Sequence, residues 1–243
     1  MINSVRNTVL SILNKNNYGY ISPSDFNLFA KQAQLDIFDD YFYQYNSLIN
    51  KENARMLGTG YADVRKGYEE VINLFSQTNT LTQNTNNTYY LPSQTTTADD
   101  YYLINKVLVY SNNLLQGEAE KVTHSKINLL NSSLLTTPSL TYPAYTQEGG
   151  IITLFPATIV GANDVQSQYI RYPKPPKWTY LTVSSGDPVF NQSATDYQDF
   201  ELSPDDETSL VFKILQYAGM SIREISAAEF GVQQENMENQ DEN

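Results

Sequence analysis

The chain has 243 residues, a mass of 27.6 kDa and a formal net charge of −12 at pH 7. That length fits one large domain or two small ones and allows a sizeable core. The absence of cysteine excludes disulfides and thiolate sites, and one histidine, His124, would have to serve any zinc site or Ser-His-Asp triad. No apolar run is long enough for a transmembrane helix, and the first residues lack the apolar region of a signal peptide, so neither is expected.

Amides and phenols replace much of the usual charge in this sequence. Asparagine and glutamine together make 40 of the 243 residues, tyrosine makes 19, and charged residues are only 17%. Tyrosine offers a large contact area with few rotatable bonds and a polar tip, which suits lasting contact with other proteins. A codon bias of an AT-rich genome explains the same composition, and both explanations stay open.

The acidity lies in the last fifth of the chain. Residues 196–243 contain two basic and twelve acidic side chains, whereas residues 1–76 and 77–195 each have a net charge of −1. Because no stripe of basic residues exists, sequence-specific binding of nucleic acid is not expected.

The first part of the chain is predicted to be helical, with a helical region over residues 1–76. Apolar residues recur at helical spacing near 5–13, over about 23–55 and near 61–76. The second of these helices begins at Ser22-Pro23-Ser24-Asp25, which supplies a cap, a proline at the first position and an early acid.

The character of the sequence changes at residues 77–97, where fifteen of 21 residues are threonine, asparagine or glutamine. We predict a polar loop there, because the segment has little to bury. The pattern over 99–110 fits a strand or a helix, and residues 118–132 are predicted to form a short helix.

The clearest strand signals follow. Two apolar segments, 142–146 and 151–155, flank Gln147-Glu148-Gly149-Gly150 and predict a hairpin, and further strands are predicted at 165–172 and 179–183. Between these two strands, the three prolines of 172–178 predict an extended strut.

A last helix is predicted after Ser203-Pro204, which repeats the earlier start signal, and residues 231–243 are predicted to be a disordered acidic tail. The expected fold is α+β, with an N-terminal bundle of long helices, a small antiparallel β region within an α+β region at 98–225, and a C-terminal helix.

The sequence offers no constellation for catalysis, so we predict that the chain is not an enzyme and uses no cofactor or metal. Gly58-Thr59-Gly60 is not followed by the lysine of a phosphate loop. Glu120 and His124 are spaced to share a helix face, but one carboxylate and one imidazole do not make a metal site. The adjacent acidic pairs, such as Asp99-Asp100, point to different faces and do not form acid–base dyads.

Two segments are candidates for contact with a neighbouring subunit. The first is the aromatic run Tyr41, Phe42, Tyr43 and Tyr45, which extends more than halfway around its helix; it is either central to its own domain or partly covered by a partner. The second is the strut, whose candidate residues are Arg171, Tyr172, Lys174, Lys177 and Trp178. Its cations are expected either to stay in water or to meet the acidic segment of the next subunit.

Several strings carry a resemblance to a known family. They are NKNNYGYISPSDFN at 14–27, GTGYADV at 58–64, YPAYTQEGGIITLFP at 142–156, QYIRYPKPPKWTY at 168–180 and LVFKILQYAGMSIRE at 210–224. Together they resemble virion structural proteins of crAss-like tailed bacteriophages, and more narrowly the neck ring proteins that act as connectors or head-to-tail adaptors. The resemblance covers nearly the whole chain in the same order.

This resemblance implies a structural virion protein that forms a ring below the portal, connects the portal to the tail and continues the DNA channel. It implies assembly in the host bacterial cytoplasm, a homo-oligomer of about twelve copies to match the portal, and contacts with the portal, other neck rings and tail proteins. Packaged double-stranded DNA would pass without specific binding, and no membrane is involved. The alternatives are a carbohydrate-binding or other tail component, and a host-directed regulatory protein that is monomeric.

Overall fold

The computed structural model describes residues 1–15, 21–53, 62–111, 114–183 and 186–222. The chain divides into two compact units, one formed by residues 1–71 together with those from 173 onward, and the other by residues 72–172. The chain therefore leaves the first unit, builds the second and returns to the first. Each unit is described by itself below.

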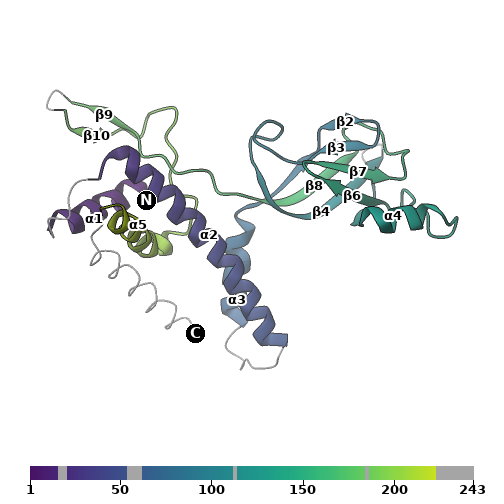
Figure 1. Cartoon of the computed structure of the whole chain (residues 1–243), viewed down its shortest axis with the longest axis horizontal. Helices are drawn as coiled ribbons and strands as arrows, with labels where there is room; N and C mark the ends of the chain where they lie inside the picture. Colours follow the sequence, from purple (N-terminus) through teal and green to yellow (C-terminus); the bar gives the residue numbers. More distant parts are fainter. Residues whose placement is uncertain (16–20, 54–61, 112–113, 184–185, 223–243) are drawn as a thin grey trace. The chain divides into compact units, whose positions relative to one another are not determined.

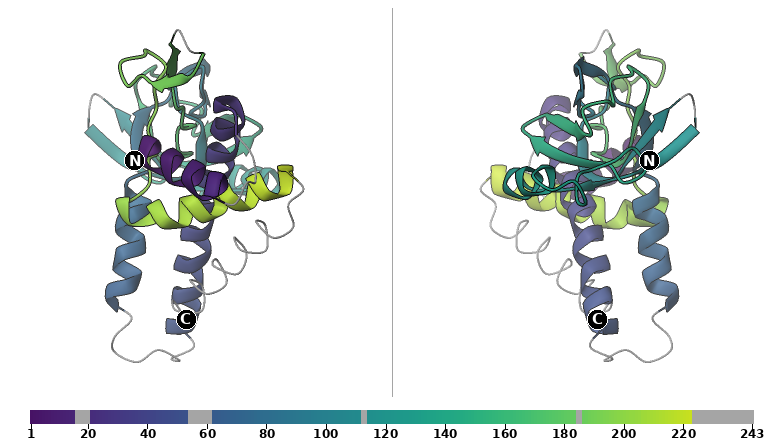
Figure 2. Two further views of the ribbon diagram at one scale, coloured as in Figure 1. Left: turned by 90° about the vertical axis from the view of Figure 1, so that its left-hand side faces the viewer. Right: turned by 90° about the vertical axis from the view of Figure 1, so that its right-hand side faces the viewer.

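The first unit is mainly helical (Figure 1). Its elements are α1 (Ile2–Lys15), α2 (Pro23–Asn53), α3 (Ala62–Asn73, whose last two residues are in the second unit), β9 (Tyr180–Thr182), β10 (Pro188–Phe190), a 3-10 turn η1 (Pro204–Asp206) and α5 (Glu207–Ile222). Helix α5 packs against both α1 and α2. The two views of Figure 2 show α5 lying across the N-terminal helices.

Helix α2 starts where the sequence predicts. The Ser22 hydroxyl accepts a hydrogen bond from the backbone N–H of Asp25 at 3.2 Å and donates one to its carboxylate at 2.7 Å. The matching signal at Ser203 produces a 3-10 turn before α5, and the Ser203 side chain caps nothing. Apolar side chains from the three packed helices fill the core; they include Val5, Val9, Phe26, Ala30, Phe38, Leu210 and Ile214.

The second unit is built on one curled sheet of eight strands. The strands are β1 (Ser76–Thr80), β2 (Gln83–Thr85), β3 (Thr88–Tyr90), β4 (Tyr101–Ser111), β5 (Leu114–Lys121), β6 (Ala144–Glu148), β7 (Ile151–Phe155) and β8 (Val165–Arg171). Their order across the sheet is β1-β8-β4-β5-β6-β7-β3-β2. All neighbouring pairs are antiparallel except β5 and β6, which are parallel.

The parallel pair needs a crossover, and α4 (His124–Asn131) supplies it. The Thr123 side chain caps this helix by accepting a hydrogen bond from the N–H of Lys126. Ile127 of α4 packs with Val122 and Ala144 in a small separate cluster on the sheet. This crossover places the chain between α4 and β6 on the outside of the unit.

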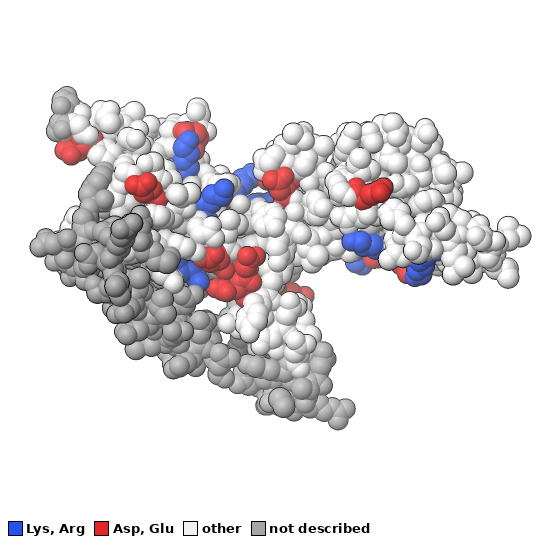
Figure 3. Space-filling view, in the orientation of Figure 1, with Lys and Arg blue, Asp and Glu red and all other residues white. Residues whose placement is uncertain are grey.

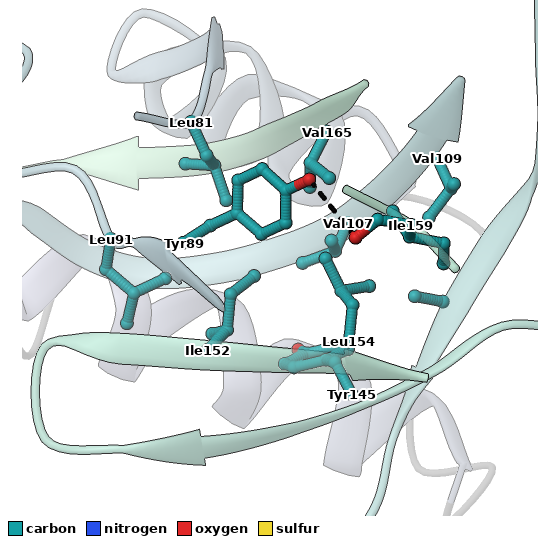
Figure 4. Packing of buried hydrophobic residues seen from close by; sticks show 11 residues of the cluster. Leu81, Tyr89, Leu91, Val107, Val109, Tyr145, Ile152, Leu154, Ile159 and Val165 are labelled. Atoms are coloured by element: carbon teal, nitrogen blue, oxygen red, sulfur yellow. Dashed lines mark hydrogen bonds between the residues drawn. The ribbon is translucent and has the colours of Figure 1, made fainter. Parts of the chain in front are cut away.

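The interior of the curled sheet is apolar (Figure 4). Tyr89 is fully buried there, and its hydroxyl donates a hydrogen bond to the carbonyl oxygen of Gly161 at 2.9 Å. Burial, together with the nearby Asp164 carboxylate, raises the pKa of Tyr89 to about 12. The side chains packed around it include Leu81, Val107, Val109, Ile152, Leu154 and Val165.

The predicted fold class is wrong in its balance of helix and sheet. The chain is not a bundle of long helices with a small β region, because the eight-stranded sheet accounts for most of the second unit. The predicted polar loop at 77–97 contains β2, β3 and nearly all of β1, and the predicted helix at 118–132 contains the end of β5 before α4 begins. The segment at 99–110, for which the sequence fitted a strand or a helix, forms strand β4.

The reason for these errors is that β1 and β3 gain their stability from distant partners, β8 and β7. Strand β1 pairs with β8 along its whole length, from Ser76 opposite Ile170 to Thr80 opposite Gln166. Polar side chains at such an edge remain in water while one side of the strand pairs with its neighbour. The division of the chain at 71/72 and 172/173 also differs from the predicted regions at 1–76, 77–97 and 98–225. The predicted tail at 231–243 lies outside the described residues.

Candidate interaction surfaces

The proline strut is bound by α2 and by the segment 196–201 of the first unit. The Gln34 amide donates to the carbonyl oxygen of Lys174 at 2.8 Å and accepts from the N–H of Glu201 at 3.1 Å. The N–H of Lys174 donates to the Glu201 carboxylate at 2.7 Å. An extended segment without a sheet around it needs such partners for its backbone, and side-chain amides supply them here.

Trp178 ends the strut and is buried, with 2% of its surface exposed. The Asn27 side chain holds its backbone on both sides, accepting from the N–H at 2.8 Å and donating to the carbonyl oxygen at 3.1 Å. The indole N–H donates to the side-chain oxygen of Asn3 at 3.1 Å, and the guanidinium of Arg6 lies 3.8 Å from the centre of the ring. The tryptophan therefore locks α1, α2 and the strut together and offers no open face to a ligand.

The cations of the strut find partners within the chain. Arg171, in the second unit, is buried, donates to the carbonyl oxygen of Tyr172 at 3.0 Å and lies 5.9 Å from the ring of Phe75. The ammonium of Lys177 pairs with the Asp196 carboxylate at 2.6 Å, and this hydrogen bond lowers the pKa of Asp196. Of the two possibilities for these cations, water or the acidic segment of the next subunit, neither describes Lys177, because an acidic side chain of its own chain contacts it.

The aromatic run on α2 is only partly exposed. Tyr41 is buried and donates a hydrogen bond to the Asp206 carboxylate; burial, followed by that bond, raises its pKa. Phe42 is half-buried and meets Phe38 edge-on, with ring centres 5.0 Å apart. Tyr45 is half-buried and Tyr43 is 72% exposed. Tyr43 is therefore the member of the run that presents most of its side chain to a partner.

Sequence reasoning missed an apolar surface that follows α4. Leu134 and Leu135 are each 96% exposed, Leu129 and Tyr142 are more than 70% exposed, and Leu140 is 40% exposed. We name residues 129–142 the leucine loop. A signal was present in the sequence, because residues 127–147 contain no charged side chain although they include five leucines and two tyrosines beyond Ile127.

The leucine loop is held in shape by its own polar side chains. The Thr136 hydroxyl donates to the carbonyl oxygen of Leu130 at 3.1 Å, and the Thr137 hydroxyl donates to that of Ser133 at 2.7 Å. Its end is fixed at β5, where a Cβ on Gly117 would lie 2.5 Å from the carbonyl oxygen of Thr141. Only glycine allows this approach. The leucines therefore sit on an ordered backbone and point away from the core of their unit.

The β9–β10 hairpin of the first unit has one face that packs on Trp178 and one that points away from it. Tyr180 and Phe190 both stack on Trp178, with ring centres 5.6 and 5.9 Å away. Leu181 and Val189 pair across the strands and are 62% and 50% exposed. Because side chains alternate along a strand, they form the face opposite Tyr180 and Phe190.

Acidic side chains gather on α2 of the first unit, in the red group near the centre of Figure 3. Asp40 pairs with the ammonium of Lys213 at 3.2 Å, and Asp36 accepts from the Tyr217 hydroxyl. Partial burial, then repulsion from Asp36 and Asp40, raises the pKa of Asp39. These pairs tie α2 to α5 rather than forming a separate binding site.

The pair considered as a metal site does not share a helix. Glu120 is in β5 and binds the ammonium of Lys126 at 2.9 Å, whereas His124 is the first residue of α4 and is exposed. Across the described part of the chain, no group of three or more His, Cys, Asp or Glu side chains has the geometry to hold a metal ion. Nor does any described helix combine the length and the apolar character that a membrane span requires.

Comparison with protein-family models and with curated proteins gives no match for this sequence.

Proposed function

We propose that this chain is a structural subunit of a bacteriophage neck, forming a homo-oligomeric ring that connects the portal to the tail and continues the DNA channel. The observation that carries the proposal is the apolar surface that each unit leaves outside its own core. Nearly complete exposure of Leu134 and Leu135 on an ordered loop is unfavourable in water and typical of a surface that a partner covers.

Two features of the sequence indicate which class of partner covers this apolar surface. The amide- and tyrosine-rich composition favours lasting protein contact, and the resemblance of the five strings to crAss-like neck proteins supports a virion as the assembly in which that contact is made. The ring would contain about twelve copies, because a neck ring stacks on a portal of that symmetry. The acidic end of the chain agrees with DNA passing without adhesion.

The surroundings of Trp178 do not support the alternative of sugar binding. A carbohydrate platform needs an open aromatic face, and the only tryptophan of the chain has Arg6 over its ring and stacks with Tyr180 and Phe190. A screen of the purified chain against a glycan array tests this directly, and specific binding there would favour the alternative.

Quantitative mass spectrometry of purified phage particles tests the proposal. We expect the chain in virions at a copy number equal to that of the portal, about twelve per particle. Absence from purified particles would contradict the proposal and favour a host-directed protein. A copy number many times that of the portal would instead favour a tail-tube or capsid component.

A further inference from the structure

We propose that the leucine loop of one copy packs on the β9–β10 hairpin of the next copy, on the face that points away from Trp178, and that this contact closes the ring. The inference rests on the proposed function and names the surfaces that would join its subunits. It commits to a second copy of this chain as the occupant of both surfaces. Three observations on the two surfaces support it.

The first observation is that the two surfaces differ in shape and come from different units. The leucine loop projects single leucines from a hydrogen-bonded turn, whereas the hairpin presents a cross-strand apolar pair, Leu181 and Val189. A ring requires a head-to-tail contact, in which each subunit offers two unlike surfaces to its two neighbours. This chain has the β9–β10 hairpin in its first unit and the leucine loop in its second.

The second observation concerns charge. Every copy has a net charge of −12, so two copies repel wherever their acidic surfaces approach. Residues 127–147 have no charged side chain, and residues 178–195 have one, Asp187. In Figure 3 the end of the second unit beyond α4 is white, free of both basic and acidic side chains on the visible face. Identical acidic subunits can meet at these surfaces without bringing like charges together.

The third observation is that both surfaces are ordered before any contact forms. Threonine hydroxyls and Gly117 fix the leucine loop, and the stack of Tyr180 and Phe190 on buried Trp178 fixes the hairpin. An isolated two-stranded hairpin is marginal in water, so this anchoring is what keeps its outer face presented. Ordered surfaces lose little conformational entropy on association.

Disulfide trapping tests the contact, because the natural chain has no cysteine. The variant with Leu135→Cys and Leu181→Cys has one thiol on each surface, and the two single variants are the controls. Under mild oxidation we expect the double variant to give a ladder of covalent oligomers and each single variant to stay monomeric on a denaturing gel. A covalent dimer from Leu135→Cys alone, or from Leu181→Cys alone, would overturn the inference, because it shows like surfaces meeting.

A mixing experiment checks the direction of the contact. Leu134→Asp with Leu135→Asp charges the loop, Leu181→Asp charges the hairpin, and Leu28→Asp charges an exposed leucine of α2 outside both surfaces. Each charged surface should abolish species larger than a monomer, while Leu28→Asp should assemble like the natural chain. A mixture of the loop and hairpin variants should form dimers only, since each still has one intact surface.

Circular dichroism and the fluorescence of Trp178 show whether these variants stay folded. Rings that persist with both surfaces charged would overturn this inference and leave the proposed function standing. A natural chain that remains monomeric at every concentration tested, alone and with the portal, would contradict both.

Discussion

The two units of this chain pair their backbone hydrogen-bonding groups by different means. In the second unit, the backbone is paired within one sheet and the apolar interior around Tyr89 is enclosed by it. In the first unit, the return segment from residue 173 has little sheet to join, and side chains of α2 bind its backbone instead. A unit assembled from two distant parts of the chain thus depends on polar links that a continuous sheet does not need.

These polar links are concentrated where the N-terminal helices meet the return segment. The Asp199 carboxylate accepts from the backbone N–H of Ile2 at 2.7 Å and from that of Phe200 at 2.8 Å, and pairs with the N-terminal amine at 3.1 Å. It thereby satisfies donors at the start of α1. The comparison predicts that the first unit is sensitive to loss of Trp178 and of the side chains that hydrogen-bond to it, and the second to loss of apolar volume.

The largest effect is expected for Trp178→Ala. The change removes the ring on which Arg6, Tyr180 and Phe190 pack and leaves a cavity, so we expect a loss of about 3–5 kcal/mol in the free energy of unfolding. Urea unfolding followed by circular dichroism measures it. A loss below about 1 kcal/mol would show that the strut is not an essential link, since surface changes fall in that range.

The next effect is expected for Leu154→Ala in the second unit. Leu154 is fully buried beside Ile152, and we expect about 2–5 kcal/mol of destabilisation from lost burial and a residual cavity. Leu103→Ala on β4, where the side chain is half exposed, is the matched control and should change stability little. Equal losses for both variants would contradict the description of the curled sheet as enclosing the core.

A smaller but more specific effect is expected for Asn27→Ala. It leaves the backbone N–H and carbonyl oxygen of Trp178 without their partner, which should cost about 1–3 kcal/mol. Because Trp178 is the only tryptophan, a red shift of its fluorescence would show that the strut loosens. Asn128→Ala on α4, an exposed amide of the second unit, should leave both the stability and the spectrum unchanged.

The smallest effect is the acid dependence that Asp199 contributes. Burial alone would raise its pKa, but the hydrogen bonds from Ile2, the N-terminal amine and Phe200 outweigh burial and lower it. A carboxyl group with a lowered pKa stabilises the fold above its unfolded pKa of about 3.9, and this contribution is lost as the pH falls through the folded value. The group is partly exposed, so the loss should be at most about 1 kcal/mol.

Comparing the free energy of unfolding of Asp199→Asn with that of the natural chain measures the contribution of the Asp199 carboxylate. The variant should be less stable than the natural chain at neutral pH, and the difference should shrink as the pH falls below about 4. A difference that is constant down to pH 2 would show that the charge of Asp199 has no part in holding α1.

Local signals in the sequence located α1, α2, α3 and one hairpin. Ser22 and Pro23 start α2, and apolar spacing locates α1 and α3. Gly149, with a φ of +58°, forms the turn between β6 and β7 that the Glu-Gly-Gly sequence predicts. In each case the determining residues lie within a few positions of the element that they shape.

The remaining parts depend on contacts that a single sequence does not display. Strand β1 consists of five polar residues, SQTNT, and is a strand only because β8, some 90 residues away, pairs with it. The burial of Tyr41 depends on Asp206, and that of Trp178 on Asn3 and Arg6. The leucine loop was missed for a different reason, since exposed leucines follow neither helical nor strand spacing and their signal is an absence of charge.

Native mass spectrometry of the full chain, alone and together with the portal, tests the central claim most directly. The account predicts a closed oligomer whose mass is about twelve times that of the 27.6 kDa chain, without a continuous series of larger species. A chain that remains a monomer under all of these conditions would contradict it, and so would an open-ended series of oligomers.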